Sequence, residues 1–402
     1  MNNKKVIREY ELATPLFYGF WVVLNAMMAF RIRGLGTGMA DFANHNVWSE
    51  QILNTGFDLS NLYHNGVAFF MSVFGMRSNF AGALLVFIMQ MIFITAIHYW
   101  TWRLLKDYVQ PKWILFAVAV PALAGSLPNF FGPHFMYHFA FGINVWHNPT
   151  SFTVMPFVIL SFFLFCQILI LSGVEKPQRI RTYLSIRLDS YYVNCFILAV
   201  LLFLSVYGKV SWLPLFAMAA LIFLFVWWAS SKFSIERLKY CAIVGLCFIP
   251  AGILTLWVSN NTIYSTEFAL GITSTIRPFS IILNLVFPIF VACLCYKKLK
   301  VNKFYQIAWM TYISALLQAV FIIEGGGRES HGNMTWWVLY ALTILIMVSL
   351  MEFIKYLYES HSSAESKRLK WVVPVGLSLA AVHLFSGVYY ALHIYFGGTF
   401  WF

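Results

Sequence analysis

The chain has 402 residues, of which 60% are hydrophobic and only 10% are charged, and its formal net charge is +12. With a mean hydropathy of +0.73, this balance excludes a soluble globular protein. The basic residues are spread over short segments between apolar runs, which argues against a nucleic-acid-binding protein. The sequence therefore predicts an all-α polytopic membrane protein whose residues 1–402 form one transmembrane domain.

Apolar runs of roughly 17–25 residues, the length that spans a bilayer as a helix, recur along the whole chain. A shorter apolar segment at 66–75 is expected to lie at the interface or to re-enter. Basic residues before the first run resemble the start of a signal peptide, but no clear cleavage site follows, so we expect an uncleaved first span. We predict about eleven spans, at residues 15–30, 80–102, 113–128, 150–172, 191–207, 211–230, 240–258, 279–296, 306–323, 336–354 and 371–395.

The charges of the loops predict the orientation. An N-terminus on the inner side places 21 of the 27 basic residues in inner loops, as the positive-inside rule requires. An odd number of spans then puts the C-terminus outside. The predicted outer loops, at 31–79, 128–149 and 324–335, concentrate histidine, carboxylate, glycine and asparagine residues, so we expect function on the outer face. The outer basic residues are Arg31, Arg33, Arg77, Lys209, Arg277 and Arg328.

The first outer loop carries a carboxylate and a histidine at helical spacing. Asp41 and His45 are four residues apart and would share one face of a helix. An apolar side on the same segment predicts a helix that lies along the membrane surface; it is formed by Val47, Trp48, Ile52 and Leu53. On such a helix Asp41 is a candidate general base, with His45 beside it. The alternative is that Asp41 caps the helix and His45 is a solvated loop residue. Tyr63 and His64, later in the loop, are candidate substrate contacts.

The second outer loop contains three histidines among aromatic residues. His134 and His138 have the spacing of a two-histidine metal pair, but no glutamate follows His134 as it does in zinc-binding helices. We therefore predict substrate contact or interfacial packing rather than a metal site. In the stretch W-H-N-P-T, His147 is a further candidate for substrate contact. Asn148 is another, and it is also expected to cap a helix that has Pro149 in its first turn.

The late outer loop, E-G-G-G-R-E-S-H-G-N, is dense in polar groups. Arg328 stands among Glu324, Glu329 and His331, which are candidate substrate contacts, after three glycines that let the backbone approach a ligand closely. An arginine can hold a phosphate through two hydrogen bonds, so Arg328 is a candidate for the phosphate of a donor substrate. The alternative is a local Arg–Glu pair in a glycine-rich turn. Arg277, before Pro278, is a second phosphate candidate or a snorkelling interfacial residue.

The motif D-F-x-x-H, followed by a surface helix, a glycine and Tyr63, resembles the C-type (GT-C) membrane glycosyltransferases of bacterial surface polysaccharides. The motif covers only Asp41–Tyr63, whereas the predicted topology is similar over most of the chain. The resemblance implies a sugar donor on a polyprenyl phosphate or diphosphate. It also implies inverting transfer to a glycan or lipid-linked acceptor on the outer face of the bacterial cytoplasmic membrane. Asp41 would take the acceptor proton. Metal-dependent members carry a paired acidic motif that is absent here, so the sequence does not support a divalent metal and assigns no cofactor.

Two other interpretations remain. The stretches W-H-N-P-T and E-G-G-G-R also resemble those of bacterial polysaccharide membrane proteins, and O-antigen polymerases and ligases use outer-loop Arg, Glu and His residues on diphosphate-linked glycans. The short late loop favours the glycosyltransferase over these enzymes. A flippase or transporter for a lipid-linked sugar would use the same basic groups without a base, and would tolerate Asp41→Asn. Membrane-bound acyl transfer would depend on His98, whose surroundings look interfacial.

Overall fold

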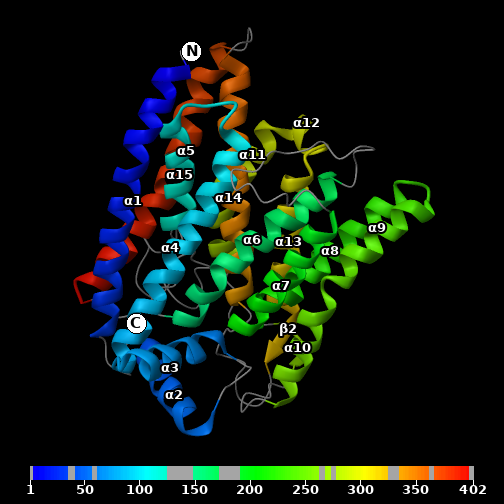
Figure 1. The fold of residues 1–402 in the computed structure, drawn as a ribbon. Coiled ribbons are helices and arrows are strands. Elements are labelled where there is room, and N and C mark those ends of the chain that lie inside the picture. Colours follow the sequence, from blue (N-terminus) through cyan, green and yellow to red (C-terminus); the bar gives the residue numbers. More distant parts are fainter. Residues whose placement is uncertain are drawn as a thin grey trace.

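The computed structural model describes residues 3–34, 41–56, 61–124, 148–171, 191–261, 268–272, 278–324, 335–361 and 366–397. This part of the chain is a bundle of helices with a single pair of short strands (Figure 1). Nine of its helical segments are long and apolar enough to cross a membrane. Helices satisfy all their backbone hydrogen bonds internally, which is why long apolar runs adopt them in lipid. The chain is thus an all-α polytopic membrane protein, as its composition predicts.

The helices follow the predicted spans, with α2 and α3 added in the first outer loop. The elements are α1 (Asn3–Arg33), α2 (Asp41–Thr55), α3 (Leu62–Phe74), α4 (Ser78–Leu105), α5 (Pro111–Leu123), α6 (Pro149–Leu171), α7 (Tyr191–Gly208), α8 (Trp212–Ala229), α9 (Ile235–Leu246), α10 (Ile249–Asn261), β1 (Phe268–Leu270), α11 (Pro278–Leu294), α12 (Tyr296–Leu299), α13 (Lys303–Phe321), β2 (Ile322–Glu324), α14 (Thr335–His361) and α15 (Ser366–Tyr395).

The predicted number of eleven spans differs from what the described helices support. Nine predicted spans coincide with long apolar segments, one of which is formed by α9 and α10 together. The predicted spans 113–128 and 279–296 correspond to the shorter apolar helices α5 and α11. The predicted turn near residue 209 is present, because α7 ends at Gly208 and α8 begins at Trp212.

Helix α14 forms the centre of the bundle. Its apolar stretch, Trp337–Ser360, is buried inside the protein, whereas the corresponding stretches of α1, α9–α10 and α15 are largely exposed. Helices α13, α11, α5 and α15 pack against α14, and α6 packs against both α4 and α7. The core is therefore built from α4, α6, α13 and α14, and the mostly exposed helices form the surface that lipid would contact.

One end of the bundle carries the segment that the sequence predicts as the first outer loop, residues 31–79. Figure 1 shows α2 and α3 at the end where α1 finishes, and α1 begins at the opposite end. Asn61 caps α3 by accepting from the backbone N–H groups of Tyr63 and His64, and Gly75 ends the helix in a left-handed conformation with φ 64°. Because α3 has 13 residues, it is too short to span, as the 66–75 segment predicts. Helix α3 packs against α2 and α4.

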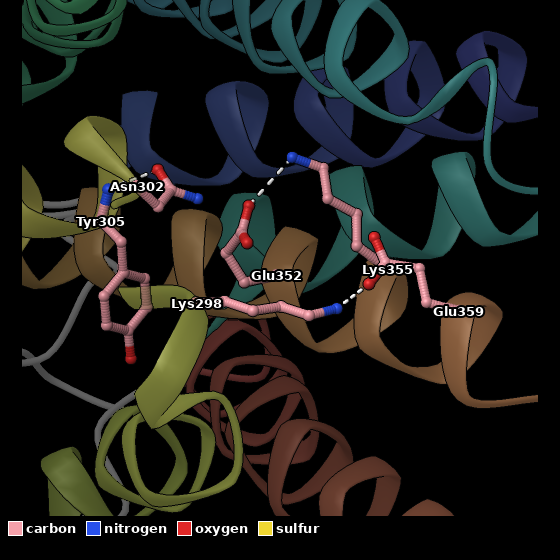
Figure 2. A network of polar contacts seen from close by, with 6 residues as sticks. All are labelled: Lys298, Asn302, Tyr305, Glu352, Lys355 and Glu359. Atoms are coloured by element: carbon pink, nitrogen blue, oxygen red, sulfur yellow. Dashed lines mark hydrogen bonds and ion pairs between the residues drawn. The ribbon is translucent and has the colours of Figure 1, made fainter. Parts of the chain in front are cut away.

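The other end of the bundle carries ion pairs between neighbouring elements. Figure 2 shows Glu352 of α14 paired with Lys355 one turn on, with 2.9 Å between the carboxylate and the ammonium. Lys298 of α12 pairs with Glu359 of α14, which ties the short α12 to the central helix. Asn302 caps α13 through the backbone N–H of Tyr305, at 3.2 Å.

Candidate functional site

Asn148 connects three parts of the chain at the end of the bundle that carries α2. It directly precedes α6, and its Oδ1 accepts from the backbone N–H of Ser151 at 3.0 Å, so it caps the helix as the sequence predicts. The same oxygen accepts from the Thr150 hydroxyl at 2.7 Å. These donors fix the orientation of the amide, because only its oxygen can face them. The Nδ2 group therefore faces α2, where it donates to the Asp41 Oδ2 at 3.1 Å.

Asp41 is the first residue of α2 and is only partly exposed. Burial raises the pKa of its carboxyl above the ordinary value of 3.8, and the charge of Lys209 and the hydrogen bond from Asn148 lower it in part. A carboxylate at the start of a helix is also favoured by the partial positive charge of the helix N-terminus. Asp41 thus has a higher proton affinity than a solvated aspartate, and two neighbours hold it in place.

Lys209 lies in the short turn between α7 and α8 and reaches the same cluster. Its Nζ donates to the Ser151 Oγ at 3.0 Å and lies 3.4 Å from the Asn148 Oδ1. Burial lowers the pKa of this ammonium to about 8, and the charge of Asp41 opposes that shift. Tyr340 of the central helix α14 donates to the Ser151 Oγ at 3.2 Å. The Asn148 amide therefore stands between a carboxylate on one side and an ammonium on the other.

Two histidines adjoin this cluster. The His45 Nδ1 and the His64 Nε2 are 2.8 Å apart, so one ring donates a hydrogen bond to the other. Burial, then the proximity of His64 and Lys209, lowers the pKa of His45 well below 6.5, which leaves it neutral near pH 7. The indole of Trp48 packs edge-on against the His45 ring, with 4.9 Å between ring centroids.

Helices α2 and α3 are held to the rest of the bundle by buried polar contacts. The Tyr63 hydroxyl donates to the Asn46 Oδ1 at 2.7 Å, and both side chains are buried. They pack against Gly82 of α4, where an added Cβ would lie 2.3 Å from the Tyr63 hydroxyl and 2.4 Å from the Asn46 Oδ1. Asn65 donates to the Tyr207 hydroxyl at 2.8 Å, which ties α3 to α7. The glycine at position 82 therefore allows α2 and α3 to pack closely against α4, and this packing positions Asp41 and His45.

The structure brings together four of the predicted site residues from the first and second outer loops. Asp41 and Asn148 are in direct contact, and His45 and His64 form the adjacent pair. Tyr63, predicted as a substrate contact, is fully buried against Asn46. Other predicted site residues lie outside the described part of the chain: His134, His138, His147, Arg277, Arg328, Glu329 and His331.

The apolar side chains of α2 do not all face the same way. Val47 and Leu53 are about half exposed, as expected for an apolar side toward the membrane, whereas Trp48 turns partly toward the histidine pair.

The predicted late loop begins at the end of β2. Glu324 ends this strand, where its backbone pairs with Phe268 of β1, and its side chain is not among the described ones. The late loop thus starts from a strand rather than directly from a helix.

Sequence reasoning missed the role of Lys209. In the sequence, Lys209 is marked only as one of the six basic residues of the predicted outer side, although it is the one lysine of that group. The turn around Lys209 is so short that the sequence indicates only a connection between two helices. Its proximity to Asn148 depends on the packing of α6 against α7, which places residues 61 positions apart in contact.

The fold and the cluster define a polytopic helical membrane protein with a partly buried carboxylate–amide–ammonium chain at one end of its bundle. Within the described residues, no group of three or more His, Cys, Asp or Glu side chains is placed to hold a metal ion. The sequence matches no protein-family model and none of the curated proteins with which it was compared.

Proposed function

We propose that the protein is a membrane glycosyltransferase that moves a sugar from a polyprenyl-phosphate or polyprenyl-diphosphate donor to a surface glycan or lipid-linked acceptor. The observation that supports this most is the hydrogen-bonded chain from Asp41 through Asn148 to Lys209. It presents one carboxylate of raised proton affinity, partly exposed, at the end of a membrane bundle. This is the arrangement that a general base acting on an acceptor hydroxyl needs.

In the proposed reaction Asp41 takes the proton of the acceptor hydroxyl. The acceptor oxygen attacks the anomeric carbon and forms the new C–O bond. The bond between that carbon and the donor phosphate oxygen breaks, and the lipid phosphate leaves with the electron pair. Attack from the side opposite the leaving group inverts the anomeric configuration. Positive charge near the leaving phosphate would stabilise the transition state, a role that the sequence assigns to Arg328 and Arg277.

Asn148 and Lys209 act in this proposal as positioning residues. Asn148 holds the Asp41 carboxylate through the amide N–H and is itself fixed by the start of α6. The Lys209 ammonium fixes the other side of the amide and favours the charged form of Asp41. His45 and His64 would line the acceptor side of the cluster. In this proposal the cluster faces the outer side of the bacterial cytoplasmic membrane, as the distribution of basic residues favours.

Transfer in proteoliposomes tests this function. The purified protein is supplied with a labelled polyprenyl-phosphate sugar, with the polyprenyl-diphosphate sugar or with the corresponding nucleotide sugar, and with an extract of cell-surface glycans as acceptor. We expect a labelled glycan, release of the lipid phosphate, and an inverted anomeric linkage by NMR, with a lipid-linked donor only. Movement of the labelled lipid across the bilayer without any glycosidic product would identify a flippase and contradict the proposal. Repeated addition to one growing chain would instead indicate a polymerase, which shares the reaction class.

A further inference from the structure

A pair of cations shares one indole ring at a distance from the candidate site. The ring belongs to Trp227, near the end of α8. The guanidinium of Arg237, from α9, lies 5.0 Å from its centroid, and the ammonium of Lys303, from α13, lies 5.2 Å from it. The two charges are therefore within about 10 Å of each other. That separation is comparable with the screening length of about 8 Å at physiological ionic strength, so the repulsion between the two like charges is only partly screened.

Helix C-termini satisfy part of the hydrogen-bonding capacity of these cations. Arg237 donates through one nitrogen to the Trp227 carbonyl at 3.3 Å and lies 3.5 Å from the Ser230 hydroxyl. Lys303 donates to the Leu169 carbonyl at 3.3 Å. A guanidinium has five N–H donors and an ammonium has three. The ion pairs that the described residues form involve neither cation. Both cations are partly exposed and could still bind an anion.

The surface that leads to this pair is apolar. Four large side chains on the outward face of α8 are exposed, with the spacing i, i+1, i+4, i+5 that places them on one stripe: Leu221, Ile222, Phe225 and Val226. The stripe ends next to Trp227. Beyond it, the turn into α9 exposes Phe233 and Ile235. Figure 1 shows α9 projecting away from the rest of the bundle.

We infer that Arg237, Lys303 and Trp227 form a binding site for the phosphate group of an anionic phospholipid, whose acyl chains lie along the exposed stripe of α8. A stripe of aliphatic and aromatic side chains matches acyl chains, and tryptophan is favoured at the depth of lipid headgroups. Two cations at the end of the stripe match a phosphate. Basic pockets between membrane helices bind anionic headgroups in this manner.

Lipid retention measured by native mass spectrometry tests the site. The protein, delipidated in a mild detergent, is titrated with phosphatidylglycerol or phosphatidylcholine of the same chains. We expect preferential binding of phosphatidylglycerol, and a loss of about tenfold or more in that binding for the double variant Arg237→Gln, Lys303→Gln, since each cation near an anionic headgroup contributes about fivefold. The control Lys232→Gln, Lys239→Gln removes two charges from the same region and should change binding less than about twofold.

Two further arms separate a lipid site from a folding defect and from a site for free phosphate. The variant Arg237→Lys, Lys303→Arg keeps both charges and should retain the preference, which separates lost charge from lost folding. Inorganic phosphate at millimolar concentration should leave phosphatidylglycerol bound, because the acyl chains supply most of the affinity. Equal binding of both lipids, an unchanged affinity in the double glutamine variant, or displacement by inorganic phosphate would each overturn the assignment. The last result would indicate a site for a soluble phosphate.

Discussion

Replacement of Asn148 by alanine separates the candidate site from the scaffold around it. The change removes the amide N–H that reaches Asp41 and the oxygen that accepts from Ser151, Thr150 and Lys209. Activity requires the ionised Asp41 carboxylate in the proposed reaction. Loss of a hydrogen bond that favours the charged form raises the pKa of Asp41 further above its ordinary value. The acid side of the activity profile should therefore move to higher pH.

The contacts of Asn148 determine how far the pKa of Asp41 should rise and how much stability the protein should lose. A hydrogen bond to a charged group contributes about 1.5–3 kcal/mol, and the lower end applies because Asp41 is partly exposed. That corresponds to roughly a tenfold change in the protonation equilibrium of the carboxyl. Loss of the cap costs about 1 kcal/mol, and loss of the buried hydrogen bonds adds a similar amount. Together with the lost bond to Asp41, these losses should lower the unfolding free energy by about 2–4 kcal/mol.

The assay is the transfer rate across pH 4.5–9, about the span in which carboxyl, imidazole and amine groups titrate, together with unfolding temperature in detergent. Asn148→Asp is the matched variant, because aspartate caps a helix as well as asparagine does. It should retain more stability than Asn148→Ala, yet shift the acid side further, since a second carboxylate beside Asp41 opposes ionisation. An acid side that stayed in place in both variants, with protein still folded, would refute the hydrogen-bonded role of Asn148.

Three further predictions follow from other contacts. Burial lowers the pKa of Lys209 to about 8, so activity should fall as the pH rises through that value and the ammonium deprotonates. The variant Lys209→Arg should keep activity at higher pH. If the alkaline side of its pH profile matched that of the wild type, the role of Lys209 would be contradicted. Gly82→Ala should lower the unfolding free energy by about 1–3 kcal/mol because the methyl group meets the Tyr63 hydroxyl, whereas Gly252→Ala, with open space around it, should be neutral or slightly stabilising by thermal unfolding. Glu352→Ala should destabilise the protein by about 1–3 kcal/mol, since it leaves the partly buried Lys355 without its carboxylate partner, and Glu352→Gln should destabilise it less. Unfolding temperatures equal to that of the wild type in both variants would show that the pair does not stabilise the fold.

Much of the fold is predictable because the bilayer imposes strong constraints. A helix that crosses lipid needs an uninterrupted apolar run, so hydropathy locates α4 and α6 to within a few residues of their observed ends. The predicted span at 336–354 underestimates α14, which continues to His361. The apolar run ends before the helix does. Charged residues follow in the last turns of α14, and the helix continues because residues such as Glu352 and Lys355 pair with each other.

The candidate site was predictable only where local chemistry marked it. The helix around Asp41 and His45 and the cap at Asn148 follow from spacing and capping preferences alone. Contacts between helices carry no such local signal. The bond between Asp41 and Asn148 joins residues 107 positions apart, and the approach of Lys209 depends on how α6 and α7 pack. The sequence predicts that Lys209 is the one lysine among the basic residues of the outer side, but it does not predict which polar group Lys209 contacts.

The central claim is that the Asp41 carboxylate acts as the base for sugar transfer, and the most direct measurement is the single-turnover transfer rate of Asp41→Asn at saturating lipid-linked donor. Glu50→Gln is the control, because Glu50 is an exposed carboxylate on the same helix. The account predicts a loss of roughly 100-fold or more for Asp41→Asn, the usual contribution of a general base, with donor binding retained and with Glu50→Gln close to wild type. Transfer at the wild-type rate by folded Asp41→Asn protein would contradict it.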